Sequence, residues 1–332
     1  MLVLGRRDVE ELLDLDLLTD ALAVAMLDLS AGRASVPGRV AARVLDQDGL
    51  LAAMPGYTPS AGALASKLVT LFPHNAVLGL PTHQAVIAVF EPDTGTPTAL
   101  IDGTSITAMR TGAGSALATR LLARADAAAM AILGTGVQAR SHARAVTRVR
   151  DFQELRVAGR DPGKAQALAQ ELAAELDVNV RVAGSWQEAC AGADVICATT
   201  HALEPVVRRE WLAPGVHVTS VGYNPRGREI DDATVVDALV VVESREAALT
   251  PPPAGSNDPR SNDLTEPIER GLVDAEDVVE VGELVAGAKP GRTSPLQITL
   301  YKSVGVAVQD GAAAALVLQA ARERGVGQQI AF

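Results

Sequence analysis

The chain has few aromatic residues and an excess of acidic ones. Tryptophan, tyrosine and phenylalanine make up only 3% of its 332 residues, so its hydrophobic cores must be built from alanine, valine and leucine. Apolar residues make up 48% of the chain, which is ample for two domains at this length. The net charge of −11 argues against nucleic acid or an anionic membrane as the main partner.

The chain also lacks the usual signals of a membrane segment, a metal site or a secretory leader. No stretch approaches the roughly 20 apolar residues that a membrane helix needs. Cys190 and Cys197 fall in separate predicted elements without metal-ligand spacing, so we expect reduced structural thiols and no metal. Asp8, Glu10 and Glu11 disrupt the basic-then-apolar layout of a signal peptide. We therefore expect a soluble cytoplasmic protein.

The N-terminal third predicts a helix followed by an antiparallel sheet. Leucine and methionine recur every three or four residues over 8–31, which predicts one helix ended by Gly32. From 36 to 101 the pattern becomes short apolar runs broken by glycine and proline. The last of these runs predicts a hairpin that turns at residues 93–96.

The rest of the chain predicts a doubly wound parallel sheet. After a helix at about 106–123, apolar strands alternate with helices, which is the α/β pattern. A Pro/Gly/Ser/Asn-rich segment at 250–263 predicts a loop. Since six strands complete a doubly wound series, we expect the final strand and the alanine-rich helix to return to the N-terminal domain. The strands are predicted at 130–133, 155–158, 180–183, 195–200, 216–222 and 238–244, and the helices at 137–149, 162–176 and from 185.

The string AILGTGVQA at 131–139 indicates a dinucleotide site. It predicts a buried strand, a glycine turn and a helix whose N-terminus can receive a pyrophosphate. Gly134 permits the tight turn, Gly136 lets the backbone approach the phosphates, and Ala139 allows close helix packing. The alternative is an ordinary strand-to-helix turn.

The end of the next strand favours NADP(H) over NAD(H). An NAD site usually has a carboxylate there for the ribose 2′-OH, but this chain has Gly159 followed by Arg160. An arginine binds a 2′-phosphate well, and glycine removes the repulsive acid. In the alternative readings, Arg160 is a solvated surface residue or Asp161 restores NAD binding.

Three cationic residues precede the glycine turn in the sequence, each among apolar neighbours, where burying an unpaired cation would be costly. Arg39, Lys67 and Arg110, the last in ITAMRT at 106–111, are either structural ion pairs or ligands of an anion. Beside a nicotinamide site, they suggest redox chemistry on a small carboxylate.

Over essentially its whole length, the chain resembles the ornithine cyclodeaminase/mu-crystallin family. The resemblance implies a Rossmann domain at 119–300 and an α+β substrate-binding and dimerisation domain formed by 1–118 with 301–332. It also implies a homodimer. The matching strings are PGRVAAR (37–43), AAMPGY (52–57), SKLVTLFPHN (66–75), THQA (82–85), ITAMRTGA (106–113), AILGTGVQA (131–139), GADVICATT (192–200), REIDD (228–232) and YKSVGVAVQD (301–310).

The resemblance also implies roles for particular residues. Arg39, Lys67 and Arg110 would grip the substrate carboxylate, with Thr82 as a further polar contact and Lys67 as a possible proton donor. Asn224 would orient a substrate amine or a water. We assign cofactor binding to Thr111, Gly134, Thr135, Gly136, Val137, Gln138, Arg160, Thr199, Val221 and Ser303, the last in a Lys-Ser pair of the mu-crystallin type.

Other polar and pocket residues are less decisive. His83 is either a core histidine or a site residue, and His142 and His201 are not expected to do chemistry. We expect the residues that shape the substrate pocket to include Met54, Tyr57 and the 250–263 loop.

Two departures from the family pattern bear on the reaction. Ornithine cyclodeaminases have a glutamate where this chain has Ala52, and an aspartate where it has Asn224. A methyl group and an amide cannot do the proton transfers that cyclodeamination needs. We therefore predict an NAD(P)H-dependent reductase of small 2-imino acids, either a cyclic ketimine reductase or an amino-acid dehydrogenase. The alternatives are an NAD-recycling ornithine cyclodeaminase and an NADPH-dependent binding protein for small carboxylates.

Overall fold

The computed structural model describes residues 1–222, 224, 227–249 and 262–331. The chain divides into two compact units: unit 1 is Met1–Arg110 with Gly305–Phe332, and unit 2 is Thr111–Val304. The chain passes from the first to the second within one helix, α3 (Gly103–Leu122). From the sequence we placed these joins at 118/119 and 300/301. The roles assigned to the two domains stay a prediction.

Unit 1 is built on a seven-stranded sheet with the strand order β15-β1-β6-β5-β4-β3-β2. All neighbouring strands are antiparallel except the parallel pair β1 and β6. The predicted hairpin is present as β5 and β6. The elements of unit 1 are β1 (Leu2–Leu4), α1 (Arg6–Leu12), α2 (Leu15–Ser30), β2 (Val40–Val44), β3 (Gly49–Thr58), β4 (Ala63–Leu71), β5 (His83–Phe90), β6 (Pro97–Asp102), α11 (Ala307–Arg324) and β15 (Gln328–Gln329), with 3-10 turns at Leu45–Gln47, Pro59–Ala61 and Pro73–Leu78.

The prediction of one helix over 8–31 was wrong, because α1 and α2 are separate. Asp14 has extended backbone, and its side chain accepts hydrogen bonds from the backbone N–H groups of Asp16 and Leu17. An aspartate that satisfies the open N–H groups of a first turn begins a new helix. The apolar periodicity runs through both helices, so it did not show the break.

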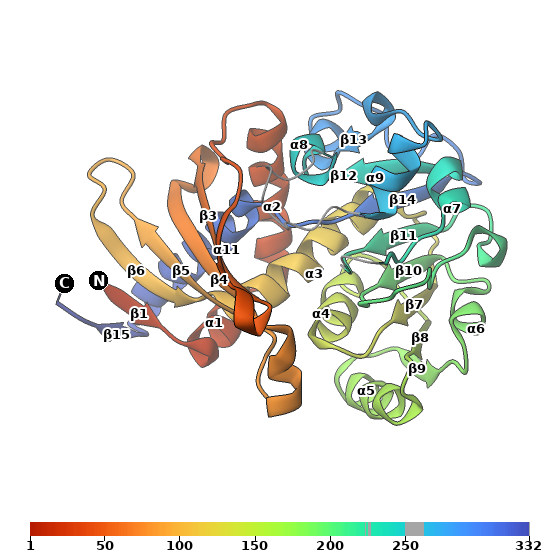
Figure 1. Cartoon of the computed structure of the whole chain (residues 1–332), viewed down its shortest axis with the longest axis horizontal. Helices are drawn as coiled ribbons and strands as arrows, with labels where there is room; N and C mark the ends of the chain where they lie inside the picture. Colours follow the sequence, from red (N-terminus) through yellow and green to blue (C-terminus); the bar gives the residue numbers. More distant parts are fainter. Residues whose placement is uncertain (223, 225–226, 250–261, 332) are drawn as a thin grey trace. The chain divides into compact units, whose positions relative to one another are not determined.

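Helix α11 covers one face of the sheet of unit 1. It packs against β3, β4 and β5, and α2 packs against α11 (Figure 1). Side chains alternate between the two faces along each strand. On β4, Ala65 and Lys67 are therefore buried on the α11 side, whereas Leu68 is exposed on the other.

Unit 2 is an eight-stranded, fully parallel sheet with the order β13-β12-β14-β11-β10-β7-β8-β9. In Figure 1, α4 lies on one side of it and α6 and α7 lie on the other. This is a Rossmann-type doubly wound fold, so the predicted fold class is confirmed. The elements are β7 (Ala129–Leu133), α4 (Val137–Val146), β8 (Glu154–Ala158), α5 (Pro162–Glu175), β9 (Asn179–Val182), α6 (Trp186–Cys190), β10 (Val195–Ala198), β11 (His217–Ser220), α7 (Asp232–Asp237), β12 (Ala238–Val242), α8 (Arg245–Leu249), α9 (Asn262–Glu269), β13 (Val279–Glu280), α10 (Val281–Val285) and β14 (Ile298–Lys302), with 3-10 turns at Arg209–Trp211 and Ala275–Asp277.

The predicted place of the last long strand was wrong. Strand β14 lies between β11 and β12 in the sheet of unit 2 and does not return with α11. All five of its residues are buried, as expected for a central parallel strand with both faces covered. The predicted loop at 250–263 also ends earlier, since α9 begins at Asn262. Its residues 250–261 lie outside the described residues.

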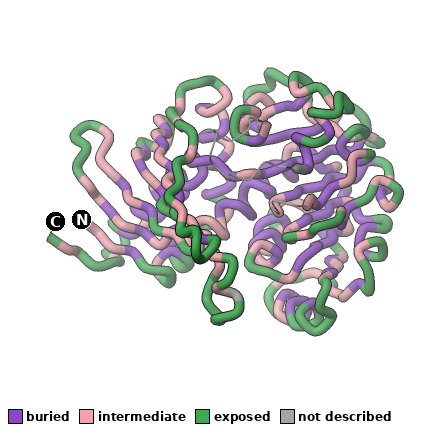
Figure 2. Tube along the Cα trace, viewed as in Figure 1, coloured by how far each residue is buried: buried purple, intermediate pink, exposed green. Residues whose placement is uncertain are grey.

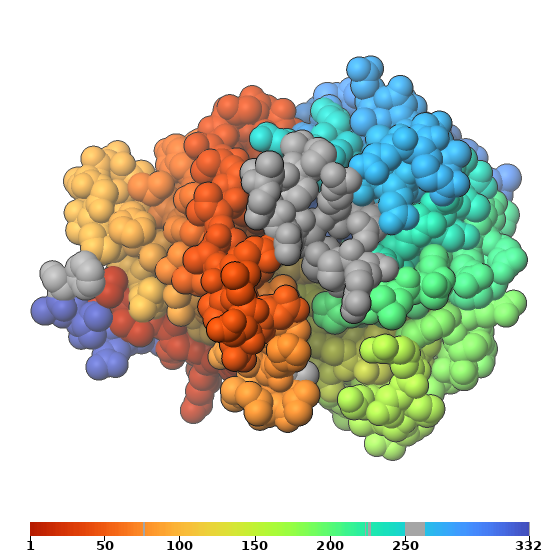
Figure 3. Space-filling view, viewed as in Figure 1, coloured from red at the N-terminus to blue at the C-terminus, as the bar shows by residue number. Residues whose placement is uncertain are grey.

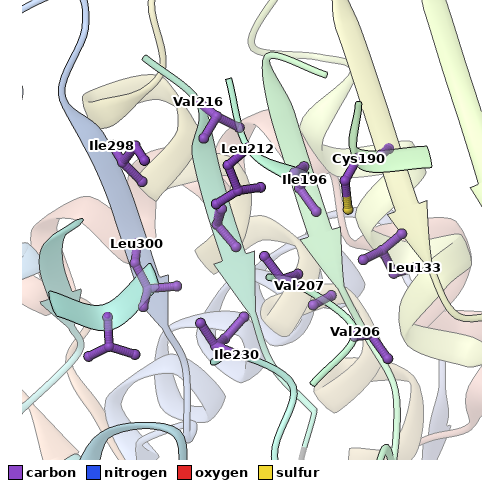
Figure 4. Packing of buried hydrophobic residues seen from close by; sticks show 14 of the residues in the cluster. Leu133, Cys190, Ile196, Val206, Val207, Leu212, Val216, Ile230, Ile298 and Leu300 are labelled. Carbon is purple, nitrogen blue, oxygen red and sulfur yellow. The ribbon is translucent and has the colours of Figure 1, made fainter. Parts of the chain in front are cut away.

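The core of unit 2 is made of alanine, valine, leucine and isoleucine, as the scarcity of aromatic residues requires. Figure 4 shows Leu133, Ile196, Val216 and Leu300 packing in it, with the thiol of Cys190 among them. Figure 2 shows the strands of this sheet buried and many of the connecting segments exposed. Burial raises the pKa of both the Cys190 and the Cys197 thiol to about 12, which leaves them unreactive at neutral pH.

Two absences hold for the described residues. None of the helices there combines the length and the apolar character needed to cross a membrane. Nor do histidine, cysteine, aspartate and glutamate side chains gather there in groups of three that could hold a metal ion.

Candidate active site

The order of the parallel strands reverses between β7 and β10, and the predicted glycine turn follows β7. Gly134 has a φ of +121°, which favours glycine. A Cβ at this position would lie 2.8 Å from the carbonyl oxygen of Thr199, which follows β10. The backbone N–H and the hydroxyl of Thr199 both donate to the carbonyl of Leu133, each at 2.9 Å. The two loops are thus joined at the switch point where open α/β sheets bind ligands.

The N-terminus of α4 fits a dinucleotide pyrophosphate. Its N-cap is Gly136, and no side chain of the described residues caps it. A Cβ on Gly136 would meet no atom within 4 Å, and Val137 is exposed, so the first turn faces open space. Uncapped N–H groups at a helix N-terminus attract phosphate.

The end of β8 presents an arginine and no available carboxylate. A Cβ on Gly159 would lie 2.6 Å from Cγ2 of Thr135, so a larger residue would require a shift. Arg160 is exposed. Asp161 caps α5, where its Oδ1 accepts from the backbone N–H of Lys164 at 3.1 Å. Asp161, the alternative ligand of an NAD ribose, therefore already has a structural role as the N-cap of α5.

The remaining predicted cofactor residues lie on α3, on α4 and at the carboxyl ends of β11 and β14. Thr111 is buried on α3, next to a glycine that packs closely against Ser141 of α4. On α4, the backbone carbonyl of Gln138 lies 2.7 Å from Nδ1 of His142. The N–H of Val221, after β11, donates to the carbonyl of Ala198 at 3.1 Å.

Ser303 follows β14 and is held by a buried acid that the sequence analysis missed. Its hydroxyl donates to Oε1 of Glu243 at 2.5 Å, and Oε2 of Glu243 accepts from the N–H of Val304 at 3.2 Å. The fully buried Glu243 directly follows the apolar strand β12, and that position was the available signal.

Asn224 connects the loops that follow β10 and β11. Its Nδ2 donates to the backbone carbonyl of His201 at 3.0 Å. His201 is exposed, and its expected lack of a chemical role stays a prediction. An amide donates here where an ionised aspartate cannot.

In unit 1, two of the three predicted cations share one buried carboxylate. Nζ of Lys67 lies 2.7 Å from Oδ2 of Asp310, and Nε of Arg110 donates to Oδ1 at 3.1 Å. The side chains of Lys67 and Asp310 are each 3% exposed. Nη1 of Arg110 also donates to Oε1 of Gln309 at 3.1 Å. Asp310 was not predicted from the sequence, although an acid near the start of an Ala/Val-rich helix is a signal of the kind that identified the cations.

Burial and neighbouring charge act in opposite directions on this cluster. Burial lowers the pKa of Lys67, Asp310 raises it, and the charges of Arg110 and Arg39 lower it again, which leaves it at about 8. Burial acts to raise the pKa of Asp310, but the charges of Lys67 and Arg110 outweigh it and hold that pKa below its usual value. Asp310 is therefore ionised at neutral pH. Lys67 loses its proton at about pH 8, which is close to neutral.

Arg39 joins the same cluster through the backbone just before α11. Its Nη2 donates to the carbonyl of Gly305. Gly305 has a φ of +72°, and a Cβ there would lie 2.7 Å from Nη1 of Arg110. The segment 305–310 thus contacts all three cations. Three cations against one carboxylate leave the cluster positive, which suits an anionic ligand.

Thr82 and His83, which were also considered as site residues, contact each other. The hydroxyl of Thr82 lies 3.1 Å from Nδ1 of the exposed His83, and in the described part of the chain it makes no hydrogen bond to the three cations. His83 is therefore not a core histidine. Met54 pairs with Lys67 across β3 and β4, whereas strand alternation places Tyr57 on the opposite face of the sheet from Lys67. The place of both residues in the substrate pocket stays a prediction.

Ala52, on β3, lies on the same side of the sheet as the cation cluster. It pairs with Val69, two residues beyond Lys67, so it lies on the same face of the sheet as Lys67. A glutamate there would add a second acid to this face. The methyl group of Ala52 adds none.

The chain matches known proteins over most or all of its length. Residues 1–325 match the model of the ornithine cyclodeaminase/mu-crystallin family. The chain is 36% identical over 335 residues to a Delta(1)-pyrroline-2-carboxylate reductase of Bacillus cereus, with all of both chains covered. It is 39% identical over 282 residues to the ketimine reductase mu-crystallin of Mus musculus, which covers 85% of this chain and 83% of that protein.

A solved structure of a similarly named protein has the same fold. The Delta(1)-pyrroline-2-carboxylate reductase of Thermococcus litoralis, in complex with NADH and L-proline, superposes with a TM-score of 0.92 at 38% identity. The match covers 99% of this chain and 100% of that one. This chain belongs to the ornithine cyclodeaminase/mu-crystallin family.

Proposed function

We propose that this protein is an NAD(P)H-dependent reductase that converts small 2-imino acids, such as Δ1-pyrroline-2-carboxylate, to amino acids. The observation that carries the proposal is the buried cluster of Lys67, Arg110 and Asp310 with Arg39 beside it, since its excess positive charge suits a substrate carboxylate. Relatives at 36–39% identity are named for imine reduction.

Each part of the cluster has a chemical task. The guanidinium groups of Arg39 and Arg110 bind the carboxylate and fix the position of the adjacent imine carbon. Lys67 gives a proton to the imine nitrogen, and Asn224 orients the amine or a water. NAD(P)H, when bound, supplies the hydride that reduces the carbon–nitrogen double bond. Fixed orientation and a nearby acid lower the barrier without a covalent intermediate.

NADPH is the preferred cofactor in this proposal. Arg160 is exposed after β8, the neighbouring Gly159 has no side chain, and Asp161 is engaged in capping α5. A guanidinium suits a 2′-phosphate, whereas an NAD site uses a free acid for the 2′-OH.

The test is oxidation of NADPH and NADH by the purified protein in parallel. The substrates are Δ1-pyrroline-2-carboxylate, Δ1-piperideine-2-carboxylate, iminosuccinate, and pyruvate with ammonia. We expect rapid NADPH loss with one of them, and a loss of at least about tenfold in kcat/KM for Arg110→Ala. No oxidation with any imine, together with unchanged carboxylate binding by Arg110→Ala, would disprove the proposal.

Two other outcomes identify the alternatives. Proline and ammonia formed from ornithine without net change of the cofactor would indicate a cyclodeaminase, despite Ala52 and Asn224. Tight binding of NADPH and a carboxylate with negligible turnover would indicate a binding protein.

We also propose that the protein is a homodimer that pairs through the outer face of the sheet of unit 1. Val40, Ala53, Leu68 and Val86 are aligned across β2, β3, β4 and β5 on the face away from α11. Val40 is 66% exposed, Leu68 38% and Val86 41%. Figure 3 shows much of unit 1, in red and orange, at the surface. A contiguous exposed apolar face of this kind is typical of a subunit interface.

Sedimentation tests this interface. The double variant Leu68→Glu/Val86→Lys should sediment as a monomer while the wild type sediments as a dimer. Leu203→Glu, at an exposed leucine of unit 2, serves as the control. A monomeric wild type would refute the dimer.

A cytoplasmic location completes the proposal. Cys190 and Cys197 are both free thiols, which suits a reducing compartment. Fractionation of cells that express the tagged protein tests it.

A further inference from the structure

Asp310 lies at the centre of the cation cluster of unit 1. On α11 it meets Lys67 of β4 and Arg110 of α3, while Arg39 contacts the segment just before α11. The residues that flank Lys67 on the neighbouring strands, Met54 and Ile87, are apolar. Among the residues that the structure describes, the charged groups that act on Lys67 are Asp310, Arg110 and Arg39.

The two oxygens of Asp310 hold different cations. Oδ2 pairs with Lys67 and Oδ1 accepts from Nε of Arg110, while Gln309 accepts from Nη1 of the same guanidinium. Two bonds on different nitrogens fix the plane of a guanidinium. A lysine ammonium, by contrast, is a flexible point charge that loses its proton readily when buried. Asp310, together with Gln309, thus holds Arg110 against α11, and it favours the charged form of Lys67 against burial and the two arginines.

We propose that Asp310 is a positioning residue of the reductase: it orients Arg110 for the substrate carboxylate and keeps Lys67 protonated, and so competent to donate its proton. This inference rests on the proposed function for the meaning of that proton. Asp310 acts through the two cations and does not itself contact the substrate.

The imine carbon receives a hydride, and the pair of electrons of the C=N π bond passes to nitrogen. The nitrogen takes a proton from Nζ of Lys67, which leaves an amino acid, a neutral lysine and NAD(P)+. Solvent then returns a proton to Lys67. Without the charge of Asp310, burial and the two arginines would lower the pKa of Lys67 further, so that Lys67 would lose its proton at a lower pH than in the wild type.

The experiment measures carboxylate affinity against pH, so it does not depend on turnover. Pyrrole-2-carboxylate, a planar carboxylate that cannot be reduced here, is titrated into the NADPH-saturated protein by calorimetry from pH 6 to 10. The wild type should lose affinity as pH rises through about 8, where Lys67 loses its charge. Asp310→Asn should lose affinity at a pH lower by about one unit or more. The fall in affinity at high pH is the alkaline limb of this pH profile. The same shift is expected in the alkaline limb of the pH profile of kcat/KM.

Three variants separate this role from general destabilisation. Lys67→Met should lack the alkaline limb, and Asp310→Glu, which keeps the charge, should retain it near the wild-type pH. Asp28→Asn is the matched control, because Asp28 is a buried, ion-paired acid of the same unit that lies outside the cluster. It should leave the limb in place.

Either of two results would overturn the inference: an unmoved limb in Asp310→Asn, or a wild-type limb in Lys67→Met. The second remains decisive if Asp310→Asn does not fold. A wild type that shows the predicted limb but reduces no imine would refute the proposed function and leave the role of Asp310 intact.

Discussion

Nζ of Lys302 lies 2.7 Å from Oδ2 of Asp263, and the two side chains are 2% and 5% exposed. Lys302 also donates to the hydroxyl of Ser220 at 2.9 Å and to the carbonyl of Gly222 at 2.7 Å. Oδ1 of Asp263 accepts from the backbone N–H of Glu229 at 2.7 Å. This buried ion pair joins the ends of β11 and β14 to α9, close in sequence to the predicted cofactor residues Val221 and Ser303.

Lys302→Met should destabilise unit 2 by about 3–5 kcal/mol, because it leaves Asp263 buried without its partner charge. In the double variant Lys302→Met/Asp263→Asn, no unpaired charge remains, and the amide that replaces the carboxylate keeps an acceptor for the backbone. We therefore expect the double variant to lose less than the sum of the two single variants in guanidinium unfolding. Additive losses would show that the pair is not coupled.

Gly134→Ala and Gly136→Ala should have different effects, although both lie in one turn. A Cβ on Gly134 collides with Thr199 at a φ of +121°, so Gly134→Ala should lower stability by about 1–3 kcal/mol. A Cβ on Gly136 meets nothing within 4 Å, so Gly136→Ala should unfold like the wild type but bind NADPH at least about tenfold more weakly. Thermal unfolding and cofactor titration decide. Unchanged NADPH affinity in Gly136→Ala would contradict the assigned phosphate site.

Arg160→Ala should lower kcat/KM with NADPH by about 10–100-fold, the value of a charge-assisted pair of hydrogen bonds, and should leave kcat/KM with NADH nearly unchanged. Lys164→Ala, which removes another exposed cation nearby on α5, should have little effect. The measurement is steady-state kinetics with both cofactors. Equal losses for the two cofactors would exclude Arg160 as the group that binds the 2′-phosphate.

His142 should make the protein less stable in acid. It is buried on α4 with Nε2 at 2.8 Å from the hydroxyl of Ser115, and burial lowers its pKa from 6.5 to about 4. The unfolded chain binds the proton below pH 6.5 and the folded protein only below about 4, so its stabilising contribution is present above pH 6.5 and is lost as pH falls to 4.

The comparison is with His142→Gln, which cannot titrate in this range. Between pH 7 and 4 the wild type should lose about 3 kcal/mol more unfolding free energy than His142→Gln. The exposed His74→Gln should follow the wild type. Parallel pH profiles for the wild type and His142→Gln would refute this role of burial.

The sequence predicted what short-range patterns determine. The turn at 131–139 and the alternation of strands and helices in unit 2 follow from apolar periodicity and glycine placement, and the structure confirms both. The position of β14 depended on which strands it would pair with, and no local pattern encodes that choice. Its five buried residues fit a central strand of either sheet.

The candidate site was predicted residue by residue but not as a set of contacts. The family strings pointed to Lys67 and Arg110, yet their shared partner Asp310 lies 200 or more positions away along the chain from either. The side chain of Thr82 contacts the adjacent His83, and strand alternation turned Tyr57 away. Such contacts depend on the packing of α11 against β4, which a single sequence does not reveal.

The most direct test of the central claim follows the hydride itself. The protein is incubated with Δ1-pyrroline-2-carboxylate and NADPH that carries deuterium on one face of the nicotinamide C4, then with the opposite label, and the proline formed is analysed by mass spectrometry and NMR. We predict one deuterium at the α-carbon of proline from one of the two labelled cofactors. The other substrates of the panel are then offered with the same two labels. Product without deuterium from both labels, or no product from any of the imines, would contradict imine reduction by this chain.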